Sequence, residues 1–253
     1  MIYYYKFLVR RVAMRLETHC HTKYSKDSML SFTLLYIKCK WRKIDAIAIT
    51  EHNNMQGGLA FKEYCQKKKT PLQVIVGEEV MTESGEIIGL FLQEEIPAGL
   101  SCKETIARIR QQNGVVYVPH PYDKKREKTV LKEACIKEYA SQIDCIECYN
   151  GRNISDEYGI RQNEIADRYH ICKVIGSDAH TILEVGRNYM EVEQVPVDRE
   201  MFLKVIQSAT FHKKKCIKLS HKITKFVKLG KLIKKGNFHE VYRIIKKRLG
   251  SSM

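Results

Sequence analysis

The chain has 253 residues, of which 44% are hydrophobic, and its formal net charge is +15. This length and hydrophobic content suffice for one large domain with a sizeable core, and they argue against two small domains. The nine cysteines are an odd number without regular spacing, which argues against a secreted disulfide framework and favours reduced thiols and a cytoplasmic location.

The first residues include an apolar run from Ile2 to Val9. The run is too short to span a membrane, has no basic residues before it and no small-residue cleavage site after it. We therefore expect no transmembrane segment and no signal peptide. The run can be a weak membrane-surface anchor, but we favour Met14 as the true start, because the first predicted strand follows it at once.

After Met14, short runs rich in β-branched residues alternate with longer helical stretches, a pattern typical of a parallel sheet with crossover helices. We expect strands at Arg15–Thr18, Ala46–Thr50, Gln73–Gly77, Val115–Pro119, Ile143–Glu147 and Lys173–Gly176. We expect helices near Phe32–Arg42, Gly58–Lys69, Lys103–Asn113, Val130–Tyr139, Asp156–Tyr169 and Asp198–Ser208.

Between the third strand and its helix, residues 80–82 and 86–92 flank Ser84-Gly85, which predicts an inserted hairpin. Six or seven βα units in one domain favour an α/β fold with a TIM-like barrel over an open sheet. In such barrels the carboxyl ends of the strands converge at one mouth.

Five of the nine histidines lie in four short motifs, and each motif closes an apolar run. The motifs are His19-Cys20-His21, Thr50-Glu51-His52-Asn53, Pro119-His120-Pro121 and Gly176-Ser177-Asp178-Ala179-His180. A glutamate in Gly77-Glu78-Glu79 follows another such run. Histidines and carboxylates gathered at strand ends form a ligand set suited to Zn, Mn or Fe. A metal-dependent enzyme is therefore the leading hypothesis.

Two of the motifs have a spacing suited to chelation. Side chains alternate along a strand, so His19 and His21 can share one ion while Cys20 faces away. Asp178 and His180 repeat this arrangement at a second strand end.

Taken singly, the other residues have simpler interpretations. His52 can be a loop histidine, His120 can be a rigid turn residue between two prolines, and Asp27 can be a turn or N-cap aspartate. Together, the five histidines and two aspartates favour a common site.

The charge of the chain is concentrated at its C-terminal end. Residues 212–253 hold 14 Lys and Arg against a single acid, which leaves the rest of the chain at +2. We therefore expect a catalytic-type domain at residues 14–211 and a separate basic tail. Apolar residues recur in the tail at roughly helical spacing, and Gly230, Gly236 and Asn237 punctuate two amphipathic helices. These helices can bind nucleic acid or an anionic membrane, or can pack on the domain with their lysines solvated.

The order of these motifs is similar to that of the PHP (polymerase and histidinol phosphatase) superfamily. HxH is followed by a serine-lysine-aspartate turn, then by ITEHN, VGEE, VPHP, IECYNGR and GSDAHTILEVGRNY. The resemblance runs from about Arg15 to Glu191, and GSDAH followed by EVGRNY is its most specific part. It implies a distorted seven-stranded (β/α) barrel with two or three divalent metal ions that hydrolyses phosphate esters.

Carried over by position, the resemblance implies eight metal ligands: His19, His21, Asp27, His52, Glu79, His120, Asp178 and His180. The HxH pair would share the first ion with Asp178, while His120 would bind the second. The turn aspartate and the remaining two histidines would bind the third. Glu79 is expected to bridge the first two ions because the family pattern is Gly-x-Glu, and Glu78 remains the alternative.

The chain departs from the family pattern at two ligand-related positions. Glu51 stands before His52, where the family commonly has aspartate, and this should matter little if His52 is the ligand. At the end of the fifth strand, where many members have another histidine, this chain has Glu147 and Asn150. The second ion can therefore have a carboxylate or amide ligand there.

The resemblance implies attack of a metal-activated hydroxide on a small phosphomonoester, a nucleotide or an oligonucleotide. The planar fork of arginine suits a phosphate dianion, and Arg126, Arg152 and Arg187 are the candidate substrate-binding residues. We favour Arg187, because its motif adjoins the strand end that carries Asp178 and His180. The leaving group can be protonated by either of these two residues or by metal-bound water.

Two other functional classes stay open at this point. The chain can be a PHP-type domain that serves as a binding or structural module, although its nearly complete ligand set argues against this. It can also be a protein whose basic tail, at residues 212–253, carries the main function on nucleic acid or an anionic membrane.

Overall fold

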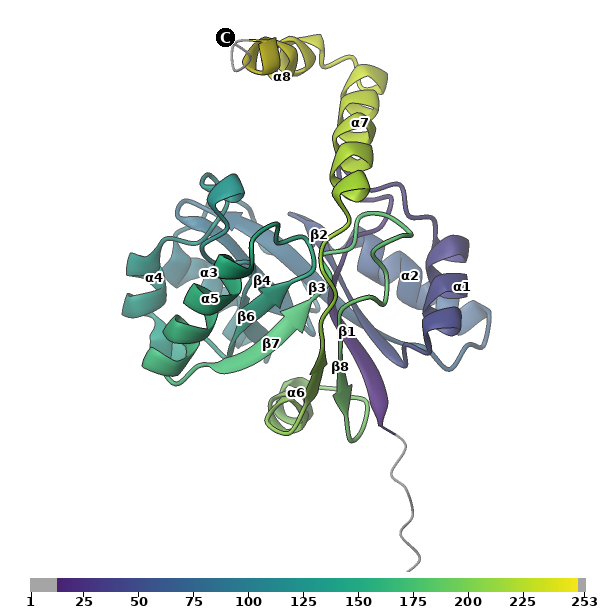
Figure 1. The fold of residues 1–253 in the computed structure, drawn as a ribbon. Coiled ribbons are helices and arrows are strands. Elements are labelled where there is room, and N and C mark those ends of the chain that lie inside the picture. The colour runs from purple at the N-terminus through teal and green to yellow at the C-terminus, as the bar shows by residue number, and fades with distance from the viewer. Residues whose placement is uncertain (1–12, 250–253) are drawn as a thin grey trace, which may run out of the picture.

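The computed structural model describes residues 13–249, which form one nine-stranded sheet surrounded by helices (Figure 1). The strands are β1 Met14–Cys20, β2 Ala46–His52, β3 Gln73–Thr82, β4 Gly85–Leu90, β5 Val115–Val118, β6 Cys145–Asn150, β7 Cys172–Gly176, β8 Tyr189–Val192 and β9 Thr210–His212. The helices are α1 Phe32–Arg42, α2 Gln56–Lys67, α3 Cys102–Gln111, α4 Glu133–Glu138, α5 Asp156–Arg168, α6 Arg199–Ile206, α7 Lys218–Lys234 and α8 Phe238–Leu249. The predictions about the apolar run at residues 2–9 fall outside the described residues.

Strands β1 to β7 form the wall of a nearly closed barrel. Strands β1, β2 and β3 are parallel, as are β5, β6 and β7, while β4 is antiparallel to both of its neighbours. The wall closes between β7 and β1 through a bridge from Cys20 to Ala179. The predicted distorted TIM-like barrel is therefore confirmed. The hairpin predicted at Ser84-Gly85 is also present, but its second strand is a full member of the barrel wall.

On the edge that faces away from β2, strand β1 has two partners, and this explains why the barrel is distorted. Its first half pairs antiparallel with β8, where Leu16 lies opposite Met190, and its last residues meet Ala179. The sheet therefore branches away from the barrel at the end opposite the mouth, where β8 and β9 extend it.

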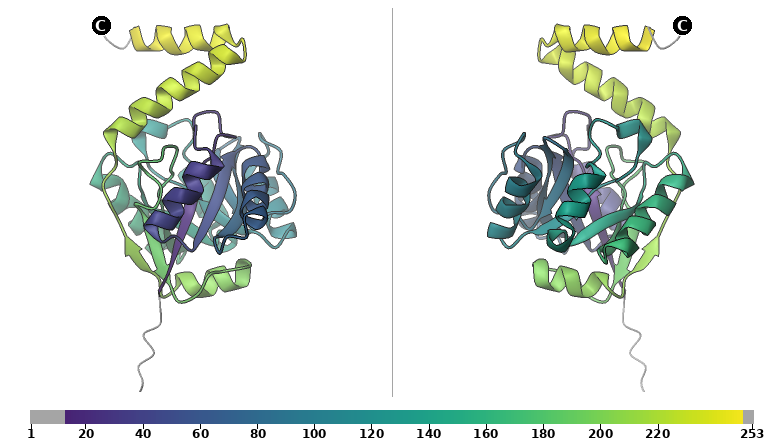
Figure 2. Two further views of the ribbon diagram at one scale, coloured as in Figure 1. Left: turned by 90° about the vertical axis from the view of Figure 1, so that its right-hand side faces the viewer. Right: turned by 90° about the vertical axis from the view of Figure 1, so that its left-hand side faces the viewer.

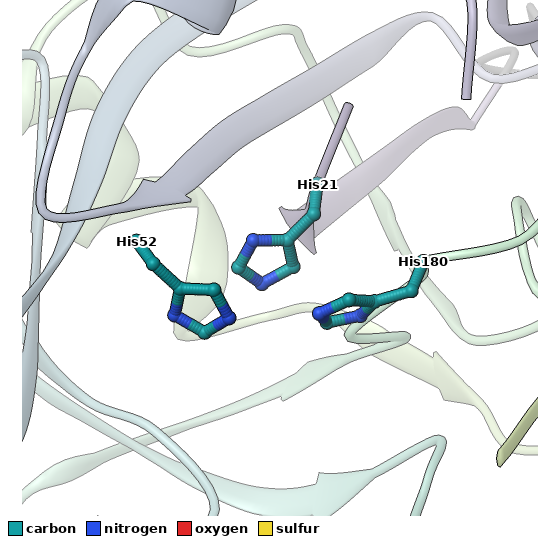
Figure 3. A group of neighbouring side chains, drawn as sticks. All are labelled: His21, His52 and His180. Atoms are coloured by element: carbon teal, nitrogen blue, oxygen red, sulfur yellow. The ribbon is translucent and has the colours of Figure 1, made fainter. Parts of the chain in front are cut away.

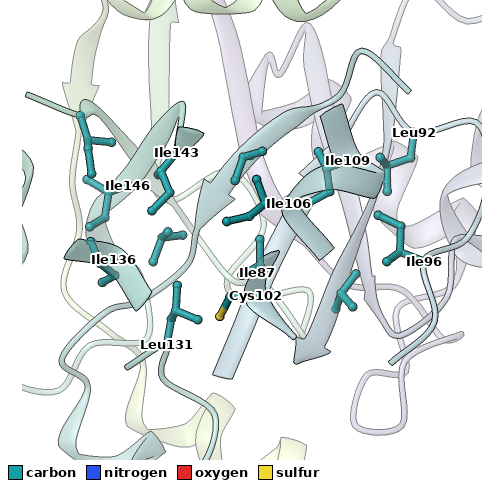
Figure 4. Close-up of a cluster of buried hydrophobic side chains, with 14 of the residues drawn as sticks. Ile87, Leu92, Ile96, Cys102, Ile106, Ile109, Leu131, Ile136, Ile143 and Ile146 are labelled. Carbon is teal, nitrogen blue, oxygen red and sulfur yellow. The ribbon is translucent and has the colours of Figure 1, made fainter. Parts of the chain in front are cut away.

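The apolar side chains form one cluster inside the barrel and two outside it. Alternation along the strands sends Ala46 and Ala48 inward, where they share the inner cluster with Tyr117. Helix α6 closes the bottom of the barrel by inserting Phe202 into the same cluster. One outer cluster lies under α1 and α2, and the other, which Figure 4 shows, lies under α3, α4 and α5.

The predicted position of α1 is confirmed at both ends. Ser31 caps its first turn by accepting a hydrogen bond from the Leu34 amide, and the helix ends at Lys43, whose φ of 55° is left-handed. Helix α4 is shorter than predicted, because the residues before it are hydrogen-bonded to the β3–β4 hairpin. The Thr129 carbonyl accepts a hydrogen bond from the Glu86 amide in β4, and the Lys132 amide donates to the Ser84 carbonyl in the turn.

The basic tail forms two helices, as its spacing predicts. Helix α7 runs through Gly230 without a break, and the two helices separate at Gly236, whose φ of 70° favours glycine. Helix α7 leaves the barrel at its mouth, and α8 lies across the far end of α7 (Figures 1 and 2). Within residues 13–249, no helix is both long enough and apolar enough to cross a membrane.

We predict that Phe202→Ala destabilises the protein by about 3–5 kcal/mol, because it leaves a cavity in the inner cluster below the site. Phe226→Ala is the matched control, because Phe226 is 68% exposed on α7. It should change the free energy of unfolding by no more than about 0.5 kcal/mol. Urea denaturation measures both values, and equal effects of the two substitutions would contradict this description of the core.

Candidate metal centre

The structure gathers all eight predicted ligands at the mouth of the barrel. His19 and Glu79 lie within β1 and β3, and His52 is the last residue of β2. The others come after strand ends: His21 after β1, His120 after β5, and Asp178 and His180 after β7. Asp27 lies on the loop between β1 and α1. His21, His52 and His180 point toward one another from three separate parts of the chain (Figure 3).

An irregularity in β1 positions the HxH pair. In an unbroken strand, Glu17 and His19 would point to the same side. Here the register of β1 against β2 shifts between Glu17 and Cys20. Glu17 therefore points outward, where it accepts hydrogen bonds from the Ser177 and Gly186 amides, while His19 turns into the barrel.

Neighbouring glutamates on β3 point to opposite sides of the sheet. Glu79 points into the barrel, where its Oε1 lies 2.9 Å from His120 Nε2 and its Oε2 lies 2.9 Å from His52 Nδ1. Glu78 points outward and accepts a hydrogen bond from the Ile96 amide. The geometry thus places Glu79, and not Glu78, among the candidate ligands.

The hydrogen-bond partners of the two Nδ1 atoms, Glu147 and Ser25, make His19 and His21 donate from these nitrogens. His19 Nδ1 lies 3.1 Å from Glu147 Oε1 and donates to it, because the carboxylate can only accept. His21 Nδ1 lies 3.0 Å from Ser25 Oγ, whose proton goes to Glu51, so this nitrogen also donates. In the neutral rings both Nε2 atoms are then lone-pair acceptors, and they face each other at 3.2 Å. Two facing acceptors need a cation or a proton between them.

His180 follows the same rule. Its Nδ1 lies 2.9 Å from the Asp178 carbonyl and donates to it, which leaves Nε2 as an acceptor. This Nε2 lies 3.2 Å from Asp27 Oδ1, and His52 Nε2 lies 3.5 Å from the same oxygen. Asp27 therefore joins two histidines at the outer side of the cluster.

Four carboxylate oxygens that face the cluster are buried without a hydrogen-bond donor: Asp27 Oδ1, Glu79 Oε2, Glu86 Oε2 and Asp178 Oδ1. A buried anion without a partner is costly, so this arrangement fits a bound cation. The donor atoms also lie close enough to act together. The sets His21-His52-His180, His19-Glu79-His120 and His19-His21-Asp178 each place their ligand atoms within 4.8 Å of one another. Imidazole nitrogen with carboxylate oxygen is a donor set for Zn, Mn or Fe.

The ionisation of the cluster follows from mutual contacts. Burial raises the pKa of Asp178, but Arg126 and His19 outweigh it and hold that pKa well below its usual range. Burial and the neighbouring imidazoles of His180 and His52 hold the pKa of His21 well below its usual value. Asp178 is thus ionised and His21 neutral, which are the forms that bind metal. Around His19 and His52 the neighbouring carboxylates outweigh burial and raise the pKa well above its usual value, so a bound ion would replace a proton at these two rings.

Glu147 and Asn150 lie behind the cluster. The oxygens of Glu147 accept hydrogen bonds from the Tyr117 hydroxyl, the His120 amide and Asn150 Nδ2, in addition to His19 Nδ1. With four donors around it, Glu147 is placed to orient His19. Asn150 is occupied in the same way, because it also donates to Asp178 and accepts from the Arg152 amide. Both residues support the ligands from outside.

Glycine and strained backbone bring the strands together at the mouth. A Cβ on Gly176 would lie 2.2 Å from Glu147 Oε1 and 2.7 Å from His19 Cβ, so only glycine fits there. His120 and Asp178 have φ values of 31° and 52°, which are uncommon for residues with side chains. Such strain is common at functional sites.

The three predicted arginines have different positions. Arg126 donates to Asp178 and Asp123 at the edge of the cluster. Arg152 is buried and contacts Glu184 and the tail helix α7. Arg187 hydrogen-bonds to the Lys215 carbonyl, and among the described residues no contact joins it to the cluster.

Glu86 is a site residue that sequence reasoning missed. It lies at the start of β4, is buried, and forms a fourth candidate group with His52 and Glu79. Its Oε2 has no hydrogen-bond donor. The predicted hairpin could have indicated this residue. Glu86 pairs with Met81, which is two residues after Glu79 on β3, so Glu86 and Glu79 point to the same side of the sheet.

These features define an α/β barrel with a buried histidine and carboxylate centre at its mouth. The PHP domain family model matches residues 17–247, and the chain therefore belongs to the PHP domain family. The resemblance inferred from the motifs is confirmed. The match also continues past residue 211, where a separate tail was predicted to begin, and that division stays a prediction.

Two uncharacterized proteins of Methanocaldococcus jannaschii are similar in sequence. One is 35% identical over 189 residues, which cover 74% of this chain and 73% of that protein. The other is 36% identical over 147 residues, which cover 54% of this chain and 82% of that protein.

Two solved structures share the fold. One is a two-domain protein from Bacteroides vulgatus containing a predicted PHP-like metal-dependent phosphoesterase, with a TM-score of 0.63 and 16% identity over 79% of this chain and 65% of that one. The other is PsfC from Pseudomonas syringae, with a TM-score of 0.60 and 15% identity over 87% of this chain and 98% of that one. At these identities the likeness concerns the fold alone.

Proposed function

We propose that this protein is a metal-dependent phosphoesterase that hydrolyses a small phosphomonoester, a nucleotide or an oligonucleotide. The observation that carries the proposal is the group of buried carboxylate oxygens without a hydrogen-bond donor, together with the His19 and His21 Nε2 atoms that face each other at 3.2 Å. Membership of the PHP family supports it, as does the phosphoesterase description of the Bacteroides vulgatus protein.

We assign two or three divalent ions, Zn, Mn or Fe, to the eight ligands predicted from the sequence. The first position has His19, His21 and Asp178, and the second has His120. Glu79 bridges them. The third position has Asp27, His52 and His180, and Glu86 is an added candidate ligand beside Glu79. Ions bound there would lower the pKa of water and neutralise charge on a phosphate group.

Arg126 is the residue that we propose to bind the phosphate. It reaches Asp178 from the loop after β5, so its guanidinium lies beside the proposed ions, whereas Arg187 is tied to the Lys215 carbonyl. A planar guanidinium can donate two parallel hydrogen bonds to phosphate oxygens. This assignment replaces our sequence-based preference for Arg187. Arg152 supports the neighbouring loop.

The alternative function is a PHP-type binding or structural module without turnover. The set of candidate ligands argues against it, because a module of that kind has no need for so many buried, mutually repelling carboxylates.

His180 is more suitable as a metal ligand than as the general acid that protonates the leaving group, since its Nδ1 proton is donated to the Asp178 carbonyl.

The proposal predicts that the protein binds two or three equivalents of Mn²⁺ or Zn²⁺ and hydrolyses at least one of three probes: a phosphomonoester, a phosphodiester or a short RNA. Asp178→Asn and His52→Ala should each lower kcat/KM by more than the roughly 10–100-fold that loss of an outer partner costs. Both should also lower the metal content. Elemental analysis and phosphate release measure the two quantities.

His239→Ala is the matched control, because His239 is exposed on α8, far along the chain from the cluster. It should keep wild-type metal content and turnover. A folded wild-type protein that binds no ion and hydrolyses no probe would favour the binding-module alternative.

We also propose that the basic tail contacts an anionic membrane surface. Leu219, Phe226 and Ile233 are exposed on α7 at seven-residue intervals, so they form one apolar stripe. By helical spacing, Lys218, Lys222 and Lys225 lie along one side of this stripe and Lys234 lies on the other. Lysine with exposed apolar side chains suits an interface of charged headgroups and acyl chains, whereas binding to nucleic-acid phosphates needs no apolar stripe.

The membrane proposal predicts that the protein cosediments with vesicles containing phosphatidylserine and not with neutral vesicles. Replacing both Phe226 and Ile233 by Ala should release it, while Ile160→Ala, which removes an exposed side chain on α5, should not. Binding to a short RNA that survives the double substitution, with no binding to vesicles, would overturn the membrane assignment in favour of nucleic acid.

A further inference from the structure

Helix α7 contacts both loops that carry the proposed third metal position. Near its start, Ser220 Oγ lies 3.0 Å from Thr181 Oγ1, in the residue after His180. Near its end, Lys231 reaches the loop between β1 and α1, which carries Asp27. The helix therefore joins the two loops across the mouth of the barrel.

The contact made by Lys231 uses its whole ammonium group. Its Nζ donates to the carbonyls of Lys23, Ser25 and Ser28, at 2.8, 2.6 and 2.6 Å. A protonated lysine has three donors, so all of them are satisfied by one loop. Main-chain carbonyls that surround a lysine in this way are held in a defined arrangement. In the sequence, Asp27 lies between Ser25 and Ser28, whose carbonyls are two of these three acceptors.

The other side of the same loop is fixed by the barrel. Glu51 accepts hydrogen bonds from the Thr22 amide at 2.9 Å and from the hydroxyls of Thr22 and Ser25. Glu51 and Lys231 therefore hold the loop from opposite sides. Since Glu51 is part of β2 but Lys231 belongs to the tail, the position of Asp27 depends on both parts of the chain.

The loop after β7 is attached to α7 in a similar way. Glu184 accepts hydrogen bonds from the amides of His180 and Thr181, both at 3.0 Å. Arg152 lies 3.5 Å from Glu184 and donates to Thr224 Oγ1 on α7 at 3.2 Å. Ser220 and Thr224 are buried in this contact.

We propose that α7 is a structural part of the metal centre and that Lys231 is a positioning residue for Asp27. Lys231 fixes the distance from Asp27 to His52 and His180, and thereby sets the affinity for an ion at this position. This inference rests on the proposed metal binding and goes beyond it, because it assigns a role in the site to a residue of the basic tail. It also gives α7 two sides, one for the barrel and one for the proposed membrane contact.

The test is Lys231→Met in the full chain, which removes the donors and keeps most of the side-chain volume. Amide hydrogen exchange in residues 23–30 of the metal-free protein should become at least about tenfold faster, because the loop opens more readily. Titration with Mn²⁺ should show the affinity of one ion falling by roughly 10–100-fold, the usual effect of losing an outer partner. The midpoint of global unfolding should change little.

Two further variants make the test specific. Lys234→Met removes an exposed lysine of the same helix and should behave as wild type. Lys231→Arg keeps the charge and several donors, and it should restore part of the loop protection and part of the Mn²⁺ affinity.

Unchanged exchange and unchanged Mn²⁺ affinity in Lys231→Met would overturn the role of α7. Tighter Mn²⁺ binding with unchanged exchange would also overturn it, because Lys231 would then act only as a repelling charge. A wild-type protein that binds no Mn²⁺ at all would instead refute the proposed metal function. The failures of the two proposals are therefore distinguishable.

Discussion

The structure depends on how the mouth of the barrel accommodates buried carboxylates. Asp27, Glu79, Glu86 and Asp178 converge there, and the side chain of Arg126 pairs with only one of them. The facing Nε2 atoms of His19 and His21, which need a cation or a proton between them, add to this demand for positive charge. Carboxylates in such a place are costly unless a cation neutralises them. Under the proposed function divalent ions supply that charge, and the site would then be a source of stability as well as of chemistry.

The rest of the molecule holds these donors in place. The irregularity in β1 turns His19 inward, and Glu147 orients its ring from behind. Gly176 lets the strands approach closely enough for that contact. Below the site, α6 closes the barrel with apolar side chains, and above it α7 contacts the two loops that carry Asp27 and His180. A barrel suits this task because its strand ends converge from many parts of the sequence.

The sequence predicted the barrel and most of the site because both depend on local patterns. Alternation alone brought His19 and His21 to one side, and the Gly-x-Glu pattern of the resemblance selected Glu79, which the structure turns toward the cluster. Glu86 was missed because its inward direction depends on the register of β4 against β3. The position of Arg126 and the contacts of Lys231 were also beyond prediction, since they depend on how distant loops and the tail pack together.

The most direct test of the central claim is anomalous diffraction from crystals of the protein grown with Mn²⁺. The account predicts two or three anomalous peaks at the mouth of the barrel, one between the Nε2 atoms of His19 and His21 and another beside Asp27 and His180. It would be contradicted by a map with no peak among these residues, in which the facing nitrogens are bridged by a proton or by water.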